Sequence, residues 1–315
     1  SYGFRPGKSA HDAVKVARLV IEQGYRWVVE VDLDAFFDRV NHDILISRVA
    51  RQVKDKRLLK LIRAYLEAGI MVDGVRQRAG GGTPQGSPLS PLLSNIMLDD
   101  FDQEFWGRGH RFVRYADDIR VFVKSKRAAE RVLEQSTRLL EQRLKLKVNV
   151  AKSVIAPAAT AVLLGYGFYF TSSGVRLRIA PKAWLRAKAR IRALTSRRWS
   201  VSMDYRVRRL NQYVRGWMGY FRLAHTPRKF SDLDEWYRRR LRQIRWKEWK
   251  RPRTRVANLR ALGVRADLAW QWGMPSRGYW RNAKSPILHR ALPTSYWQER
   301  GVVFFHPAWA RFRTT

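Results

Sequence analysis

The sequence contains no cysteine, few acidic residues and no long apolar run. The absence of Cys excludes disulfides and thiolate zinc sites and suits a reducing compartment. No apolar stretch approaches the roughly 18 residues that a membrane span needs, and the first residues lack a signal-peptide pattern. Acidic residues number 26 against 63 Lys and Arg, a formal net charge of +37. We therefore predict a cytoplasmic protein that binds a polyanion, with no membrane partner.

Basic residues and tryptophans gather in the second half. Residues 171–315 hold 35 Lys and Arg against 7 acidic residues, a net charge of +28, and 11 of the 13 Trp. Aromatic rings interleaved with Arg suit RNA, because unstacked bases lie on rings while phosphates take the charge. The same rings would equally serve as apolar anchors of a small helical domain. The second half is therefore the predicted nucleic-acid-binding part of a folded chain.

Two acidic sites lie at the ends of strand-like runs. Asp117 and Asp118 occupy a short break between RFVR (111–114) and IRVFV (119–123), and Asp32 follows the run VVEV (28–31). A tight turn lets neighbouring Asp side chains converge, although Asp is also an ordinary turn residue. If Asp32 lies beside this turn, three hard oxygen ligands surround a space suited to two Mg²⁺ ions. That arrangement serves in-line phosphoryl transfer.

A third motif lies between the acidic sites, where the glycine-rich run GGGTPQGSPLSP (80–91) passes into an apolar helix. Three motifs, in this order, resemble those of the group II intron-encoded reverse transcriptases and maturases. They are Asp32 with FF (36–37), PQGSPLSP (84–91) and YADD (115–118). The run YGFRPGKS (2–9) resembles the segment that this family carries between fingers and palm. The run LKLKVN (144–149) resembles its motif D, and LLGY (163–166) resembles its primer grip.

The second half carries its own signature. The run LNQYVRGWMGYF (210–221) resembles the core of the maturase thumb, known as domain X, so the resemblance covers nearly the whole chain. Many relatives add a Cys-containing endonuclease, which has no counterpart in this sequence. Family members also carry fingers segments ahead of the Gly-Phe-Arg-Pro motif, and this sequence starts within that region. The resemblance therefore implies a partial fingers region, a palm and a thumb of the bacterial type.

The resemblance implies roles for individual residues. Asp32, Asp117 and Asp118 correspond to the catalytic ligands of two Mg²⁺ ions. Phe37 corresponds to the position where the family packs a ring under the sugar of the incoming nucleotide, which blocks a 2′ hydroxyl and favours deoxynucleotides. Alternatively, Phe37 is an ordinary residue of the palm core. The remaining candidates for contact with the incoming nucleotide are Gln85 and Gly86 of motif B, together with Arg5, Lys8 and Lys152.

The charged candidates leave alternatives open. Arg5 and Lys8 could meet the triphosphate, and Lys152 could protonate the leaving pyrophosphate. Each of the three would equally suit a solvated surface. In the second half, the candidates for contact with nucleic acid are Arg215, Trp217, Arg238, Arg239 and Arg240.

The predicted fold class is α+β. Ser9 and Asp12 resemble a capping box ahead of a helix, and a hairpin is expected through Asp73-Gly74. One helix is expected over residues 90–105, and three more near 181–198, 205–223 and 233–249. Three domains are predicted. Residues 1–170 form partial fingers and a palm, which is an antiparallel sheet backed by helices. Residues 171–250 form the α-helical thumb, domain X, and residues 251–315 form a basic, irregular, Trp-rich tail that binds nucleic acid.

These observations predict an RNA-directed DNA polymerase that is also a splicing cofactor of a group II intron. Its partners would be intron RNA, a DNA primer or target, and deoxynucleoside triphosphates, with two Mg²⁺ ions as cofactor. One alternative is a reverse transcriptase of the same lineage that serves phage defence or acquires CRISPR spacers from RNA. Others are a maturase that only assists splicing and a basic RNA-binding protein without enzymatic activity.

Overall fold

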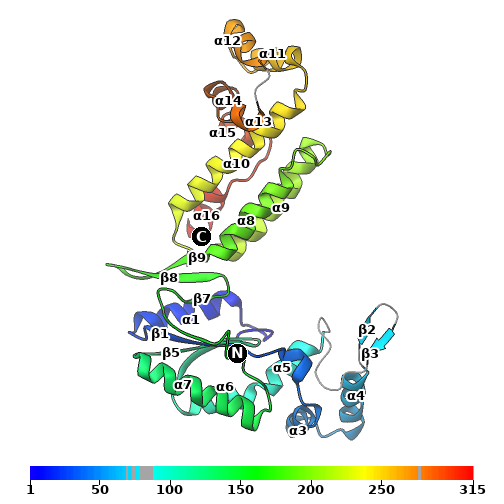
Figure 1. Cartoon of the computed structure of the whole chain (residues 1–315), viewed down its shortest axis with the longest axis vertical. Helices are drawn as coiled ribbons and strands as arrows, with labels where there is room; N and C mark the ends of the chain where they lie inside the picture. The colour runs from blue at the N-terminus through cyan, green and yellow to red at the C-terminus, as the bar shows by residue number, and fades with distance from the viewer. Residues whose placement is uncertain (69, 73–74, 78–87, 276–277, 315) are drawn as a thin grey trace. The chain divides into compact units, whose positions relative to one another are not determined.

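The computed structural model describes residues 1–68, 70–72, 75–77, 88–275 and 278–314. The chain forms two compact units, Ser1–Leu177 and Arg178–Thr315 (Figure 1). This division falls within strand β9 (Gly174–Ile179). The three predicted domains, with limits at residues 170 and 250, stay a prediction. No helix in the described ranges is long and apolar enough to cross a membrane.

The first unit is built on an antiparallel sheet of four strands in the order β4-β5-β1-β6. The central pair, β1 (Trp27–Val31) and β5 (Asp118–Val123), aligns Glu30 with Arg120 and Val31 with Ile119. β4 (Arg111–Tyr115) pairs with the outer side of β5, and β6 (Val154–Pro157) pairs with β1. The antiparallel sheet backed by helices confirms the predicted fold class.

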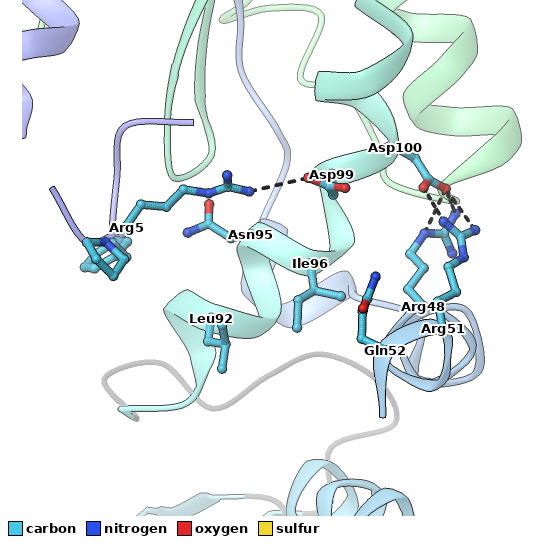
Figure 2. A pocket seen from close by; sticks show the side chains of 11 residues that line it. Arg5, Arg48, Arg51, Gln52, Leu92, Asn95, Ile96, Asp99 and Asp100 are labelled. Atoms are coloured by element: carbon cyan, nitrogen blue, oxygen red, sulfur yellow. Dashed lines mark hydrogen bonds and ion pairs between the residues drawn. The ribbon is translucent and has the colours of Figure 1, made fainter. Parts of the chain in front are cut away.

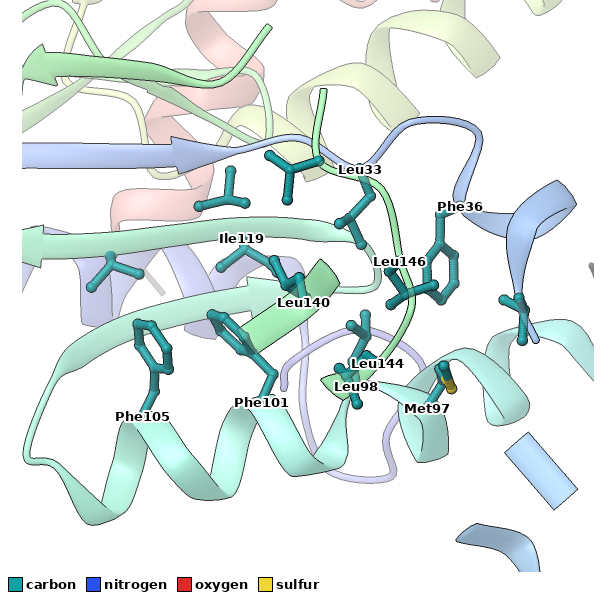
Figure 3. Close-up of a cluster of buried hydrophobic side chains, with 14 of the residues drawn as sticks. Leu33, Phe36, Met97, Leu98, Phe101, Phe105, Ile119, Leu140, Leu144 and Leu146 are labelled. Carbon is teal, nitrogen blue, oxygen red and sulfur yellow. The ribbon is translucent and has the colours of Figure 1, made fainter. Parts of the chain in front are cut away.

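The sheet divides its residues between two faces because side chains alternate along each strand. Val29, Val31, Ile119, Val121 and Val123 belong to one buried core, which also takes in Phe101 and Phe105 (Figure 3). The alternate set on β1 and β5 lies on the opposite face. This second face carries Glu30, Arg120 and Asp118 toward one end, and it is where the site described below begins.

Helices cover the sheet. α1 (Ala10–Glu22) starts at Ser9, whose Oγ accepts the backbone N–H of Asp12 at 3.2 Å, as predicted. α7 (Lys126–Arg138) continues as a short π-helix, Leu139–Arg143. The helix predicted over 90–105 is instead two helices, α5 (Ser90–Met97) and α6 (Asp99–Gly107), separated at Leu98. Three Asp in the first turn of α6 favour a helix start there, because carboxylates stabilise a helix N-terminus.

The other elements of the first unit are smaller. They are α2 (Phe36–Arg39), α3 (His42–Gln52), α4 (Lys56–Glu67), β2 (Ile70–Val72), β3 (Val75–Gln77), β7 (Val162–Leu163) and β8 (Tyr166–Thr171). β2 and β3 pair as the predicted hairpin, with Val72 opposite Val75, whereas its turn residues Asp73 and Gly74 lie outside the described residues. β7, β8 and β9 form a three-stranded sheet.

The second unit is helical. Its three long helices are α8 (Pro181–Leu194), α9 (Met203–Phe221) and α10 (Pro227–Glu248), close to the predicted spans. The tail is more regular than predicted: α11 (Pro252–Ala261), α12 (Ala266–Gly273), α13 (Tyr279–Asn282), α14 (Pro286–Ala291), α15 (Thr294–Glu299) and α16 (Phe305–Thr314). Pro252 and Pro286 occupy first helical positions, where the missing N–H costs no hydrogen bond. These prolines therefore begin helices.

Candidate active site

Asp32 and Asp118 are neighbours across two paired strands. Val31 is opposite Ile119 in the antiparallel register, so Asp32, one residue beyond the end of β1, faces the start of β5 at Asp118. The hydroxyl of Ser153 accepts the Asp32 N–H at 3.1 Å, and the Asp32 carbonyl accepts the N–H of Asn149 at 2.8 Å. Asp32 is therefore held between β5 and the segment that leads into β6.

The second acidic site is a tight hairpin turn between β4 and β5. Tyr115 pairs with Asp118, which leaves Ala116 and Asp117 as the two loop residues. Ala116 has a φ of +56°, in the left-handed region. Two-residue hairpins require a positive φ at this position, where glycine or asparagine is the usual residue. The turn thus presents Asp117 and Asp118 at the end of the sheet where Asp32 lies.

Arg120 bridges two of the acidic side chains on this face. It forms an ion pair with Asp118 and a second one, at 3.1 Å, with Glu30. Burial raises the pKa of Asp118, and the negative charges of Glu30, Asp117 and Asp32 raise it further, while Arg120 opposes them. Sequence reasoning missed Glu30 and Arg120, although both follow the two-residue period that leads to Asp32 and Asp118.

The donor set suits a hard divalent cation. The four carboxylates of Glu30, Asp32, Asp117 and Asp118 outnumber the one guanidinium of Arg120, which leaves an excess of negative charge. Carboxylate oxygens are the ligands that Mg²⁺ prefers. Among the described residues, no three acidic or histidine side chains stand together as they would around a metal ion. Because the Asp118 carboxylate is turned toward Arg120, a cation at this site would have to compete with that guanidinium for Asp118.

The other predicted residues of the first unit lie on several elements. Phe37, on α2, packs edge-on against Phe36 with ring centres 5.2 Å apart and borders the core. Lys152 is exposed beside Asn149. Lys8 is exposed and lies 5.8 Å from the centre of the Tyr2 ring. Gln85 and Gly86 lie outside the described residues.

Arg5 faces a pocket of about 460 Å³ (Figure 2). It forms an exposed ion pair with Asp99 at 3.4 Å. On the other side of the pocket, Arg48 and Arg51 bind Asp100 at 2.8 and 2.6 Å. Burial alone would raise the pKa of Asp100, but these two arginines outweigh it and hold the pKa below its usual value. The acidic residues at the start of α6 are thus already paired with cations.

In the second unit, Trp217 lies within an aromatic cluster. Its ring centre is 4.7 Å from that of Phe221, 5.5 Å from Phe305 and 5.7 Å from Trp184. Rings on several sides give Trp217 a packing role in this unit. Arg215, two residues earlier on α9, is exposed. The predicted contacts of both residues with nucleic acid stay predictions.

The three consecutive arginines of α10 are engaged inside the second unit. Arg239 donates to the Trp280 carbonyl at 3.0 Å and stacks on the Trp280 ring at 3.8 Å. Arg240 donates to Thr195 Oγ1 at 2.9 Å and to its carbonyl at 3.0 Å. Arg238 lies 5.7 Å from the centre of the Phe304 ring. Reversing all three charges would therefore disturb the fold as well as any bound polyanion.

A cationic hollow of about 430 Å³ lies where α8 ends against α10. Its lining consists of Arg192, Ser196, Arg197, Arg198, Arg240, Gln243 and Lys247. None of these described lining residues is acidic. Burial lowers the pKa of Arg240, and the charges of Arg192 and Arg197 lower it further. The hollow is therefore a concentrated site of positive charge that a phosphate group would neutralise.

Comparisons with known proteins match each unit to a family. The family described as "Reverse transcriptase (RNA-dependent DNA polymerase)" matches residues 1–168. The family described as "Group II intron, maturase-specific domain" matches residues 185–263. The turn with Asp117 and Asp118 lies in the first match, and the run 210–221 lies in the second.

Individual proteins and solved structures are similar to parts of this chain. Protein YkfC of Escherichia coli is 34% identical over 193 residues, which cover 49% of this chain and 51% of that protein. The group II intron-encoded protein LtrA of Lactococcus lactis is 40% identical over 103 residues, 33% of this chain and 17% of LtrA. A solved structure of apo telomerase from Candida tropicalis covers 96% of this chain and 57% of that chain at a TM-score of 0.46 and 10% identity. The chain spans about half the length of YkfC and less of LtrA.

Proposed function

Because the chain belongs to the reverse transcriptase family, we propose that it is an RNA-directed DNA polymerase that also binds group II intron RNA as a splicing cofactor. The observation that carries the first activity is the apposition of Asp32 with the Asp117-Asp118 turn at one end of the sheet. The substrates would be an RNA template, a DNA primer and deoxynucleoside triphosphates.

The proposed chemistry follows from the side chains at that end of the sheet. Asp32, Asp117 and Asp118 would hold two Mg²⁺ ions, which when bound activate the primer 3′ hydroxyl and neutralise charge on the leaving pyrophosphate. Asp118 would exchange its ion pair with Arg120 for this role. Lys152, exposed beyond Asn149, would supply a proton to the pyrophosphate. Phe37 would select deoxynucleotides by filling the space beneath the sugar.

The second proposed activity belongs to the second unit. The maturase-specific match and the cationic hollow at the end of α8 support binding to the phosphates of structured intron RNA. During splicing the protein would stabilise the folded intron, and it would later copy the intron at a DNA target, the process of retrohoming. The same match favours this intron role over defence or spacer acquisition. We propose that the ribonucleoprotein acts in the bacterial cytoplasm.

Removal of a carboxylate tests the proposed polymerase. Asp117→Ala and Asp118→Ala should each lower primer extension on an RNA template about a thousandfold, because losing a ligand removes several kcal/mol of transition-state stabilisation. Intron RNA affinity, measured by filter binding, should change little. Asp43→Ala, which removes an 81% exposed carboxylate on α3, is the matched control and should keep full activity. Normal extension by both turn variants would refute the assignment.

A further inference from the structure

A buried arginine lies directly beneath the turn that carries Asp117 and Asp118. We propose that Arg114 is a positioning residue that holds this turn in place through the Ala116 carbonyl. The proposal rests on the polymerase function proposed above. It adds Arg114, Asp102 and Asn95 to the residues on which the site depends, and none of these three touches the reacting atoms.

The Arg114 side chain is fully buried and almost fully satisfied. Its Nε and Nη2 donate to the two carboxylate oxygens of Asp102 at 2.7 and 2.6 Å, a bidentate pair. Its Nη1 donates to Asn95 Oδ1 at 3.1 Å and to the Ala116 carbonyl at 2.9 Å. Four of the five guanidinium donors are therefore used, and one of them fixes the turn.

The turn needs an external support. Ala116 adopts a φ of +56°, a conformation that costs a residue with a Cβ about 1–2 kcal/mol. Such residues persist where their surroundings over-determine them. The bond from Arg114 to the Ala116 carbonyl supplies that constraint one residue before Asp117. Because buried ion pairs add little net stability, the Arg114–Asp102 pair is better explained by the geometry that it imposes.

The Gly-Phe-Arg-Pro segment also lies against the turn. The Gly3 carbonyl accepts Asn95 Nδ2 at 2.9 Å, and the Tyr2 N–H donates to the Arg114 carbonyl at 2.8 Å. A Cβ added to Gly3 would lie 2.6 Å from the Ala116 nitrogen, so glycine is required by close backbone approach. The turn is thus clamped by contacts with both Arg114 and Gly3.

This clamp joins motifs that are far apart in the sequence. Asn95 lies on α5, the helix that follows the glycine-rich run, and Asp102 lies on α6. Figure 2 shows Asn95 on α5 next to Arg5, the residue after Phe4 in the N-terminal segment. Catalytic groups must be held within about 0.5 Å of their productive positions. Loosening the clamp should therefore weaken cation binding by Asp117 and Asp118 before it affects nucleotide contacts elsewhere.

The test uses the full chain and measures metal binding directly. Arg114→Lys keeps the charge but loses the planar fork, so it cannot bind Asp102 and Ala116 together. We expect Mn²⁺ affinity, measured by electron paramagnetic resonance without nucleotide, to fall at least tenfold, the effect usual for residues that orient metal ligands. The kcat for primer extension should fall as well, while KM for the nucleotide changes less than threefold.

A second buried ion pair supplies the control. Arg48 binds Asp100 at 2.8 Å, also on α6, and both side chains are buried. Arg48 also donates to the Ile44 carbonyl and Asp100 also pairs with Arg51, so these contacts run to α3 rather than to the turn. Arg48→Lys should lower thermal stability to a similar extent and leave Mn²⁺ affinity unchanged. Equal loss of Mn²⁺ affinity in the Arg48 and Arg114 variants would overturn the proposal, because a general loss of packing would then explain both.

Gly3→Ala keeps the test decisive if Arg114→Lys fails to fold. The added Cβ would displace the Ala116 nitrogen without removing a donor from the Arg114–Asp102 pair, so this variant should also weaken Mn²⁺ binding. Wild-type affinity in a folded Gly3→Ala or Arg114→Lys variant would overturn the clamp. Asp118→Ala separates the two hypotheses: if it too binds Mn²⁺ normally, the proposed active site itself is wrong.

Discussion

The pH dependence of stability should reveal a buried carboxylate in the second unit. Asp234, on α10, is only 3% exposed, and its two oxygens accept the N–H groups of Phe305 and His306 at 2.7 and 2.8 Å. These are the first residues of α16, so Asp234 caps that helix from another element. Burial raises the pKa of Asp234 to about 6, although both N–H bonds and the charges of Arg238 and His306 oppose the shift.

The sign of the effect follows from the raised pKa. The unfolded chain loses this proton near pH 3.8 and the folded chain near pH 6, so the folded state binds more protons between these values. The stabilisation is complete at low pH and is lost as pH rises through 6. The pKa of Asp234 differs by about two between the folded and unfolded states, which corresponds to about 3 kcal/mol of stability. About 2.5 kcal/mol of this stability would be lost between pH 4 and 7.5.

Asp234→Asn isolates this group from every other titration. Urea unfolding of the wild type and of Asp234→Asn at several pH values gives the free energy of unfolding of each protein. The wild-type value minus the variant value should fall by about 2.5 kcal/mol between pH 4 and 7.5. Because the amide does not titrate, its own effect on stability shifts the whole curve by a constant without changing its slope. A flat difference, or one that rises with pH, would show that the two N–H bonds outweigh burial and that the reasoning is wrong.

Two predictions concern nucleotide and RNA. Phe37→Ala should raise the ratio of kcat/KM for ribonucleotides to that for deoxynucleotides, because it opens space that only the 2′ hydroxyl needs; an unchanged ratio would make Phe37 a core residue alone. Replacing Arg197 and Arg198 of the cationic hollow by Ala should reduce the magnitude of the slope of log affinity for intron RNA against log salt concentration by about 1.4 to 1.8, since each lost phosphate contact contributes about 0.7 to 0.9. Primer extension should be retained. Replacing Arg253 and Arg260, exposed on α11, removes equal charge; the same decrease in both variants would reduce the hollow to general electrostatics.

Local signals in the sequence predicted local structure well. The Ser9 cap, the β4–β5 hairpin and the three long helices of the second unit each depend on residues close together in the chain. The break between α5 and α6 was missed, although the acidic residues from Asp99 onward are typical of a helix start. Edge strand β6 was missed because its side chains are exposed or half-buried and show no clear alternation.

The arginines of α10 show that composition alone leaves the role of a charged residue open. Arg238, Arg239 and Arg240 suggested a surface for RNA, since a run of three charges cannot all face a core. Yet Arg239 and Arg240 donate to carbonyls at Trp280 and Thr195. An arginine can satisfy several carbonyl groups from within a small helical domain, so its charge alone does not distinguish a ligand-binding residue from a capping one.

Arg114 could not have been predicted as a buried residue, because an arginine on a strand is ordinarily placed on its solvated face. Its partners on α5 and α6 lie 19 and 12 residues away, and only the folded chain brings them together. One local signal was nevertheless available. A two-residue hairpin needs a positive φ at its first loop position, and this sequence has Ala116 where glycine or asparagine would be expected. A turn of unfavourable residue type implies support from elsewhere in the fold, and a neighbouring arginine with several donors is a residue able to provide it.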